Sequence, residues 1–449
     1  ADKGYRMVII LSGMYNNLRD QTQQRLDREL TGFLQKGHCV PSPEREWFRL
    51  TGDEDFDGTP DASRISAHSG PMIAILKKNT APLEKLRTWL RSNEDAVKDM
   101  SLLLIDDESD YASLNTSMKE MPNADGVLDH TAAPTDDEIA EEEKATKINA
   151  YVRSIRNLFG TYAYVGYTAT PYANVFIDPE PDEAEFLFPG ESEPEPLGET
   201  LYPRDFITAL SKPKGYLGLE DLFPVNSEDE KDYCHFEEVD EKFQQSHSKL
   251  LSGKTDELPS SLRLAIIDYC LTGAARASLE SDWEGKDHSM MIHLSSSADP
   301  NLATANAVRD TIGSWSDLWY DVDDAEIIEL RKDMKNRWNS QFKKEYVKRT
   351  PKGGNSSAEH LFDEYMGDFL ETIEYSILND KTSEDMQIAR EAGFDVDLDY
   401  ESREEGEGWK VIVIGGDLLS RGLTINGLCV SFFTREAKNY DTLTQMGRF

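Results

Sequence analysis

The chain has 449 residues, of which 38% are hydrophobic and 10% aromatic, enough for folded cores and too many for one ordinary domain. It carries 85 acidic against 48 basic residues, a formal net charge of -37. This balance argues against a generally basic nucleic-acid-binding protein, but it leaves room for a local basic groove, because net charge governs solubility rather than individual sites. The acids crowd into four runs that we interpret as solvated insertions: Met121–Glu143, Asp178–Glu199, Glu220–Glu241 and Asp395–Glu407.

The four cysteines are scattered and form no C-x-x-C pair, so we expect neither a zinc site nor a disulfide framework. A reducing cytoplasm fits this usage best. No apolar run approaches the roughly 20 residues that a membrane span requires, and we expect no membrane partner. The chain opens on Ala1, just before a strand-like run, and we therefore expect the natural protein to begin earlier.

Arg6–Leu11 is a short, continuous apolar run, which predicts a strand buried on both faces of a parallel sheet, and Met72–Leu76 predicts a second buried strand. Ser101–Ile105 and Tyr162–Tyr167 predict a third and a fourth strand. Helical spacing predicts a helix at Leu18–Leu30, another capped by Asn79 or Thr80 that ends near Leu90, and a third at Ile148–Leu158. Strands that alternate with helices are typical of a doubly wound α/β fold.

Pro179–Gly198 is rich in Glu, Pro and Gly and predicts a flexible connection. A second α/β pattern follows, with helices expected at Ser261–Leu279, Ala303–Trp319 and Glu359–Leu378, and strands at Ser289–Leu294, Lys410–Ile414 and Leu428–Phe433. The sequence thus predicts two α/β lobes with parallel sheets, residues 1–200 and 201–449, joined by an acidic link.

The first candidate motif is LLLIDDESD at Leu102–Asp110. Ligands of open α/β sheets bind at the carboxyl ends of the strands, and nucleotide hydrolases hold Mg²⁺ with an acid placed there. Asp107 would hold the hydration shell of the metal ion, and Glu108 would orient or deprotonate the attacking water. Asp110 is placed to connect this site with a neighbouring motif.

The second motif is YTATPYAN at Tyr167–Asn174, after the fourth strand. The hydroxyl groups of Thr168 and Thr170 could donate hydrogen bonds to a neighbouring carboxylate, and Pro171 ends the strand. We expect these threonines to couple the acidic site to movement of the lobes.

Two further motifs lie near the C-terminal end. GGDLLSRGLTING at Gly415–Gly427 follows a strand; its glycines allow close approach of the backbone to an anion, and Arg421 could bind phosphate. DTLTQMGR at Asp441–Arg448 offers Arg448 as a finger that stabilises charge on a transferring phosphoryl group.

Each motif also has a simpler interpretation: a solvated acidic loop, an ordinary strand exit, a glycine turn and a surface arginine. Their order along the chain is more specific than any one of them, because it is the order of helicase motifs two, three, five and six.

On these residues the chain resembles the superfamily-two helicases: DESD at Asp107–Asp110 is similar to the DEAD-type motif. The segment from Leu201 through Gly218, together with the last two motifs, resembles the Z1 domain, which replaces the second RecA-like lobe in a group of bacterial helicase-like proteins. The resemblance implies two RecA-like lobes, ATP and Mg²⁺ as cofactors, and likeness to the motor subunits of ATP-dependent restriction endonucleases, whose nuclease is a separate chain.

The resemblance extends to SGMYNNLRDQTQQRL at Ser12–Leu26, which is similar to motif Ia and implies that Asn17 and Arg19 contact a nucleic-acid backbone. Arg19 could equally be a solvated helix residue. Lys77, Lys78 and Asn79 could add phosphate contacts, although a solvated helix entry explains them equally well. The resemblance further implies that Ser420 and Arg421 line the same path, and that Gln445 and Gly447 form the nucleotide-facing surface beside Arg448.

One departure concerns the phosphate-binding loop G-x-x-x-x-G-K-[ST], which is absent from this sequence. We therefore expect this fragment to be inactive and the full-length protein to be an ATPase. The overall prediction is a cytoplasmic DNA translocase subunit of a restriction or phage-defence system, acting on duplex DNA with a partner nuclease. Three alternatives remain open: an ATP-gated switch that recruits a nuclease without translocating, an RNA helicase, and a degenerate interaction domain.

Overall fold

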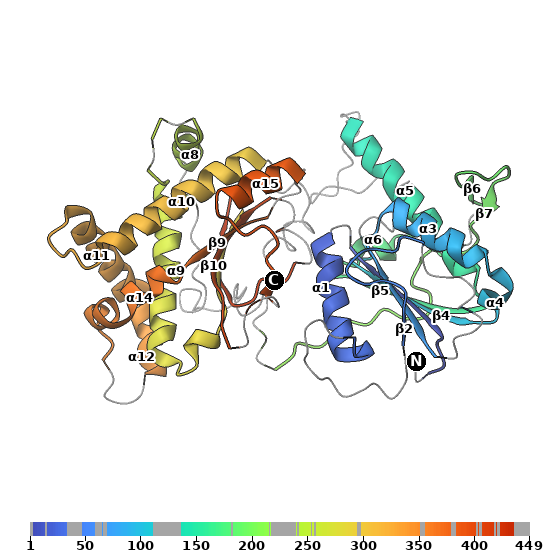
Figure 1. The fold of residues 1–449 in the computed structure, drawn as a ribbon, viewed down its shortest axis with the longest axis horizontal. Helices are drawn as coiled ribbons and strands as arrows, with labels where there is room; N and C mark the ends of the chain where they lie inside the picture. The colour runs from blue at the N-terminus through green and yellow to red at the C-terminus, as the bar shows by residue number, and fades with distance from the viewer. Residues whose placement is uncertain are drawn as a thin grey trace. The chain divides into compact units, whose positions relative to one another are not determined.

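The computed structural model describes residues 3–13, 16–33, 47–58, 65, 70–110, 136–180, 183–214, 216, 239, 242–252, 254–255, 257–293, 298–350, 355–378, 383–400, 403, 406–416, 419 and 423–434. The chain forms two compact units, Ala1–Leu210 and Ser211–Phe449 (Figure 1). Among the described residues, no helix is both long enough and apolar enough to cross a membrane.

The first unit is built on a five-stranded parallel sheet in the order β2-β3-β1-β4-β5. Its strands are β1 (Met7–Ser12), β2 (Phe48–Arg49), β3 (Met72–Leu76), β4 (Ser101–Asp107) and β5 (Thr161–Tyr167). The four predicted strands are confirmed. The two-residue strand β2 was not predicted, because it is too short to show a pattern.

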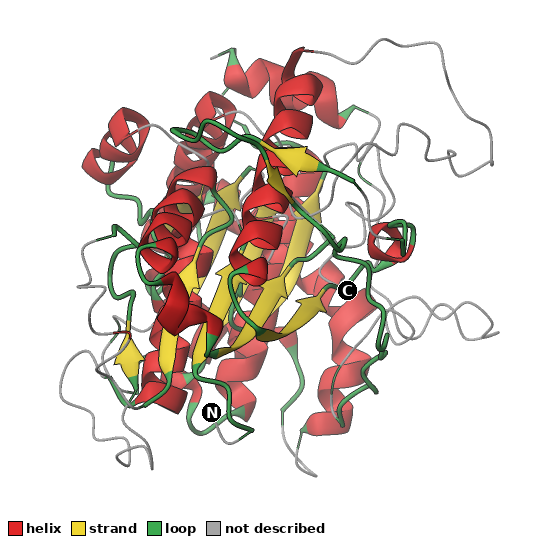
Figure 2. Ribbon diagram, turned by 90° about the vertical axis from the view of Figure 1, so that its right-hand side faces the viewer, coloured by secondary structure: helices red, strands yellow, loops and turns green. Residues whose placement is uncertain are grey.

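Helices cover both faces of this sheet: α1 (Asn16–Leu26) with the π-helical turn Asp27–Thr31, α3 (Thr80–Arg91), α4 (Glu94–Lys98), α5 (Asp136–Asn157) and α6 (Tyr172–Val175). Met7, Ile9 and Leu11 of β1 belong to one core cluster, together with residues of α3 and α5. Val8 and Ile10 point to the opposite face. Burial of alternate residues on both faces explains why β1 is apolar throughout. The strands (yellow) and the helices packed on them (red) are seen in Figure 2.

The segment expected to be a flexible connection is instead docked on the first unit. A short antiparallel hairpin, β6 (Glu185–Phe186) with β7 (Glu195–Pro196), packs the ring of Phe188, which is 1% exposed, under the guanidinium of Arg87 at 3.7 Å. Arg87 also forms ion pairs with Glu191 and Glu195. Two of the acids that suggested a solvated loop therefore bind arginine side chains of the lobe.

The second unit contains a four-stranded parallel sheet in the order β11-β8-β10-β9. Its strands are β8 (His288–His293), β9 (Glu374–Leu378), β10 (Lys410–Gly415) and β11 (Leu428–Phe433). The helices are α8 (Phe243–Leu251), α9 (Ser260–Leu279), α10 (Ala298–Leu318), α11 (Ala325–Arg337), α12 (Lys343–Arg349), α13 (Ala358–Leu361), α14 (Gly367–Glu371) and α15 (Ser383–Glu391). One large core joins the sheet to these helices, with Ile292, Ile412 and Ile414 among its members. Both units are α/β with parallel sheets, as predicted.

The long helix predicted at Glu359–Leu378 is wrong in its second half. Helix α13, the π-helical turn Phe362–Met366 and α14 end at Glu371, and Glu374–Leu378 forms strand β9 beside β10. Apolar residues continue at helical spacing into the strand, so the periodicity hid the boundary. Pairing with β10 decides the conformation of this segment.

We expect Phe188→Ala to lower the unfolding free energy of the first unit by about 3–5 kcal/mol, because it leaves a cavity under Arg87. Hydrogen exchange of amides in α3 and α5 at increasing denaturant would measure this loss within one unit of a two-unit chain. Phe206→Ala is the matched control: Phe206 is 61% exposed, and its removal should cost under about 0.5 kcal/mol. Equal effects of the two changes would mean that the hairpin is not docked.

Candidate functional site

The acidic turn lies at the carboxyl end of β4, between β1 and β5. Ser12 of β1 and Tyr167 of β5 flank Asp107 in register. Asp107 accepts the backbone N–H of Glu108 at 3.1 Å, and the N–H of Ser109 donates to the carbonyl of Tyr167 at 2.9 Å. Glu108 has a φ of +51°, a left-handed conformation that costs an L-residue roughly 1–2 kcal/mol. Such strain persists only where the surroundings impose it.

A buried ion pair beneath the turn supplies this constraint. Lys78 Nζ lies 2.7 Å from Asp106 Oδ1, with both side chains 0% exposed. The same ammonium group donates a 2.6 Å hydrogen bond to the carbonyl of Glu108. Lys78 was considered as a phosphate contact, but its burial and its two partners give it a structural part instead. Its ammonium group holds the backbone of Glu108, the residue with the left-handed conformation.

Tyr164 completes the network from β5. Its hydroxyl donates to the other oxygen of Asp106 at 2.7 Å. Burial, reinforced by the charge of Asp106 and by this hydrogen bond, holds the pKa of Tyr164 well above its usual value. The tyrosine therefore remains a neutral donor at physiological pH, and the carboxylate of Asp106 is held by Tyr164 of β5 and by Lys78 of the segment after β3.

Asp107 itself remains exposed to solvent. Partial desolvation by the surrounding protein raises its pKa, the charge of Lys78 and the N–H of Glu108 oppose this, and Asp106 and Asp110 add to the rise. Two neighbouring carboxylates thus occupy different environments: Asp106 is neutralised by a lysine in the interior, whereas Asp107 faces water at the strand end.

The structure brings the second motif into contact with the first. Thr168 Oγ1 donates to Asp110 Oδ1 at 2.7 Å, and Thr170 Oγ1 donates to Asp110 Oδ2 at 2.6 Å. The N–H of Thr170 also donates to Thr168 Oγ1 at 2.9 Å, which orders the two hydroxyls relative to each other. Both carboxylate oxygens of Asp110 are therefore hydrogen-bonded to the loop after β5, so a movement of this loop would change these bonds.

Two residues hold the adjoining backbone. Asn174 of α6 donates from its side chain to the carbonyl of Ser109 at 3.1 Å. A Cβ at Gly166 would approach Ser109 Oγ to 2.7 Å, so only glycine permits this close contact between β5 and the turn. The loops after β4 and β5 thus form one connected structure.

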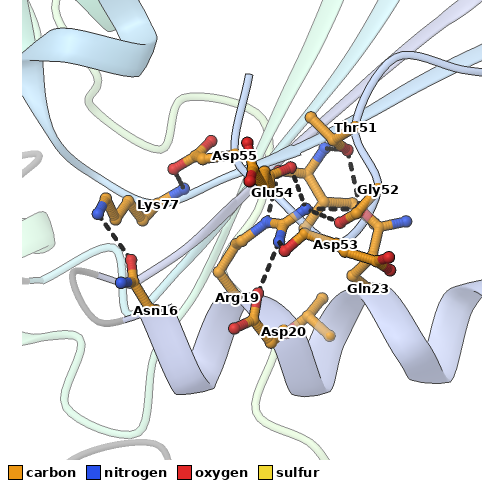
Figure 3. Close-up of polar contacts among 12 residues, drawn as sticks. Asn16, Arg19, Asp20, Gln23, Thr51, Gly52, Asp53, Glu54, Asp55 and Lys77 are labelled. Atoms are coloured by element: carbon orange, nitrogen blue, oxygen red, sulfur yellow. Dashed lines mark hydrogen bonds and ion pairs between the residues drawn. The ribbon is translucent and has the colours of Figure 1, made fainter. Parts of the chain in front are cut away.

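Arg19 lies at the centre of a second polar cluster, at the ends of β2 and β3 (Figure 3). It is 2% exposed, and its guanidinium donates to the carbonyls of Gly52, Asp53 and Glu54. Further bonds reach Ile75, Asp20 and Gln23. All five N–H groups of Arg19 are thereby used within the protein, so it holds the loop Gly52–Glu54 rather than presenting a donor to nucleic-acid phosphate.

Lys77 lies closer to solvent in the same region, where its Nζ donates to Asn16 Oδ1 at 2.7 Å. Asn17 is the second residue of α1, which begins at Asn16. Burial raises the pKa of Asp55, whose carboxylate accepts the N–H of Lys77 at 3.3 Å. This edge of the sheet therefore combines a lysine with several acids.

The glycine-rich motif after β10 has a packing reason at its first glycine. A Cβ at Gly415 would meet the carbonyl oxygen of Leu378 at 2.0 Å, because β9 and β10 approach closely there. The N–H of Gly416 donates to the same carbonyl at 3.0 Å. The remaining predicted residues of the second unit lie outside the described residues: Ser420, Arg421, Gln445, Gly447 and Arg448.

Within the described ranges, no group of three or more His, Cys, Asp or Glu side chains is placed to hold a metal ion. Mg²⁺ needs no such cage, since proteins often bind it through one or two carboxylates with waters and substrate phosphates. The exposed carboxylate of Asp107 is a hard oxygen donor at the carboxyl end of a parallel strand, and its chemistry fits this mode.

Sequence reasoning named Asp107, Glu108, Asp110 and the two threonines, but missed Asp106 and Tyr164. One signal was present: Asp106 continues an apolar strand, and a lysine follows the preceding strand-forming run along the chain. A charged residue inside a buried strand calls for a partner of opposite charge.

Lys78→Met should lower the unfolding free energy of the first unit by about 3–5 kcal/mol, because it leaves the carboxylate of Asp106 buried without its cation. The triple variant Lys78→Met, Asp106→Leu, Tyr164→Phe should recover most of this loss, since it replaces the whole network by apolar groups.

Hydrogen exchange of the β1 and β4 amides would compare these variants with Lys77→Met, a change at the partly exposed neighbour that should cost under about 0.5 kcal/mol. A Lys78→Met variant as stable as the parent would show that the ion pair does not support the sheet.

One comparison with known proteins finds a match to part of the chain. No curated protein matches it. The family model described as the Z1 domain matches residues 261–449, a range that begins within α9 at its second residue, Ser261, and contains the whole parallel sheet β11-β8-β10-β9. The match starts later than the predicted boundary of that domain at residue 201. The expected likeness to the Z1 domain is thus confirmed for the second unit from residue 261 onward.

Proposed function

We propose that this chain is part of an ATP-dependent, helicase-like motor that moves on duplex DNA. The observation that carries the proposal is the connected acidic turn: Asp107 and Glu108 at the end of β4, with Asp110 bonded by Thr168 and Thr170 from the end of β5. This arrangement is what coupling of phosphate chemistry to loop movement requires, and it occurs in a chain that also matches the Z1 domain. The parallel sheets of both units are compatible with RecA-like lobes.

Within this proposal, Asp107 and Glu108 divide the chemistry. Asp107, exposed at the strand end, would hold Mg²⁺, partly through water; the ion supplies charge stabilisation to the phosphates when it is bound. Glu108 orients or deprotonates the attacking water. The backbone of Glu108 is left-handed, and its carbonyl accepts a hydrogen bond from Lys78. This fixes the position from which the side chain of Glu108 extends.

Hydrolysis also needs a phosphate-binding loop, and the motif G-x-x-x-x-G-K-[ST] is not in this sequence. We assign ATPase activity to a full-length protein that carries such a loop. Strand β5 lies at the edge of its sheet, directly beside β4, and Tyr162 and Tyr167 on it are 38% and 51% exposed. An additional parallel strand paired there would bring its loop next to the acidic turn.

The remaining roles in the proposal rest on position in the sequence. Gln445, Gly447 and Arg448 would face the nucleotide from the Z1 domain, with Arg448 as the arginine finger. Asn17, Lys77, Ser420 and Arg421 would line the DNA backbone path, and Arg19 would support it by holding the loop Gly52–Glu54. A cytoplasmic restriction or phage-defence complex with a separate nuclease subunit is the cellular setting that we propose by family analogy.

Glu108→Gln in the full-length protein should lower DNA-stimulated ATP hydrolysis by about 10²–10⁴-fold while ATP binding persists, because the amide keeps the shape of the side chain but cannot act as a base. The measurements are phosphate release with and without duplex DNA, and equilibrium binding of ATP.

Glu94→Gln is the control, since Glu94 is an exposed acid of the same unit that lies outside the proposed site; it should keep parental turnover. Unchanged hydrolysis by the Glu108 variant would remove the proposed base. Stimulation by RNA in place of duplex DNA would favour an RNA helicase.

Thr168→Val combined with Thr170→Val should separate hydrolysis from movement. Hydrolysis should stay within about threefold of the parent, whereas displacement of a third strand from triplex DNA should fall at least about tenfold, because Asp110 loses two hydrogen bonds worth about 1.5–3 kcal/mol each.

Thr161→Val is the control for this pair, since Thr161 is exposed at the start of the same strand. Equal loss of hydrolysis and displacement in the double variant would place the threonines in the chemical step instead. A parent that hydrolyses ATP but ignores a protein roadblock on DNA would be a switch rather than a translocase.

A further inference from the structure

A basic surface interrupts the acidic composition of the second unit. Residues 331–349 contain eight lysines and arginines and two acids, in a chain whose net charge is -37. They belong to a helical run that continues without a break through α11 (Ala325–Arg337), the π-helical turn Trp338–Phe342 and α12 (Lys343–Arg349). The first half of α11 has no lysine or arginine before Arg331, so the change of charge is local.

One side of this run is fixed in the protein core. Leu330, Met334 and Trp338 are buried at helical spacing, and Trp338 Nε1 donates to the carbonyl of Ser356 at 3.2 Å. Tyr346 anchors α12 by ring contact with Trp338, with centroids 5.0 Å apart. The run is therefore a rigid support for the charges on its other side.

Two of the eight basic residues are used inside the protein. Arg331 lies over the ring of Trp319 at 4.5 Å and donates to its carbonyl at 3.0 Å. Arg337 binds both carboxylate oxygens of Asp268, at 2.7 and 2.5 Å. These arginines stabilise the helical layer and do not belong to the exposed surface.

The others lie toward solvent. We define the basic surface by its exposed members: Lys332, Lys335, Lys344, Lys348 and Arg349. Two of them form ion pairs with acidic neighbours: Lys335 with Glu359, and Lys348 with Glu345, of which the second measures 2.5 Å. All four of these side chains are about half exposed. Exposed ion pairs of this kind contribute only about 0.2–1 kcal/mol, so phosphate could replace the carboxylates at little cost.

We propose that this basic surface binds the sugar–phosphate backbone of duplex DNA, as a second contact outside the motif-lined path; the inference rests on the proposed function. Flexible lysines that project from a rigid helical run suit a backbone contact, because they bring charge without the fixed geometry of base recognition. Outside the motif-lined path, the acidic remainder of the chain repels DNA, which favours contact at this surface.

The test compares two triple variants of the full chain that remove the same charge. The first is Lys344→Gln, Lys348→Gln, Arg349→Gln on α12. The second is Lys242→Gln, Lys249→Gln, Lys254→Gln, at exposed lysines in or beside α8 of the same unit. Fluorescence anisotropy would follow binding of a labelled 30-base-pair duplex from about 50 to 200 mM salt, the range over which phosphate contacts change affinity most clearly.

The α12 variant should bind about 10–100-fold more weakly at the upper salt concentration, and its slope of log affinity against log salt should be smaller by about 2–3, close to 0.9 for each lost phosphate contact. The α8 variant should keep the parental slope. Equal weakening of both variants, or of neither, would overturn the proposed role of the basic surface. Neither result would contradict duplex DNA as the substrate.

A parent chain that binds no duplex would overturn this inference together with DNA as the substrate. Loss of binding to single-stranded RNA alone in the α12 variant would also contradict it. The arm of the Glu108 ATPase test that is run without DNA is independent of both results, so failure of the proposed hydrolysis can be recognised separately.

Discussion

The candidate site depends on a charge pair that never meets solvent. Lys78 and Asp106 are fully buried, and the lysine also bonds the carbonyl of Glu108. Transfer of two charges into the interior costs several kcal/mol for each ion, which mutual attraction and added hydrogen bonds must offset. An apolar pair would fill this space with less penalty, but it could not hold a carbonyl of a left-handed residue. We interpret the pair as a device for geometry rather than for stability.

Much of the fold follows from the sequence because parallel strands buried on both faces are apolar without alternation. This made β1, β3 and β10 recognisable, because every residue of these strands is buried. The failures have specific causes. The segment Glu374–Leu378 shares helical spacing with the residues before it, and only pairing with β10 makes it a strand. The hairpin at Glu185–Pro196 has the composition of a loop, and its ordering depends on arginines that are distant in sequence.

The sequence predicts those contacts of the site that depend only on the topology of the sheet. Neighbouring parallel strands end at one edge, which is enough to expect Asp110 near Thr168 and Thr170. The direction in which a long cationic side chain points does not follow from topology, because it depends on partners supplied by tertiary packing. Arg19 and Lys78 look like surface bases in the sequence; in the structure, one holds a loop by its carbonyls and the other pairs with a carboxylate beneath the sheet end.

The docked hairpin is closed at its base, where Thr200 Oγ1 donates to the carbonyl of Asp178 at 2.8 Å and Arg204 donates to that of Pro179 at 2.7 Å. A segment whose ends meet can be lost or exchanged without moving its flanks. Its loss would nevertheless strip Arg87 of both carboxylates and of the Phe188 ring. The hairpin and this arginine therefore depend on each other: without the hairpin, Arg87 would keep its hydrogen bond to Ser154 but lose the groups that balance its charge.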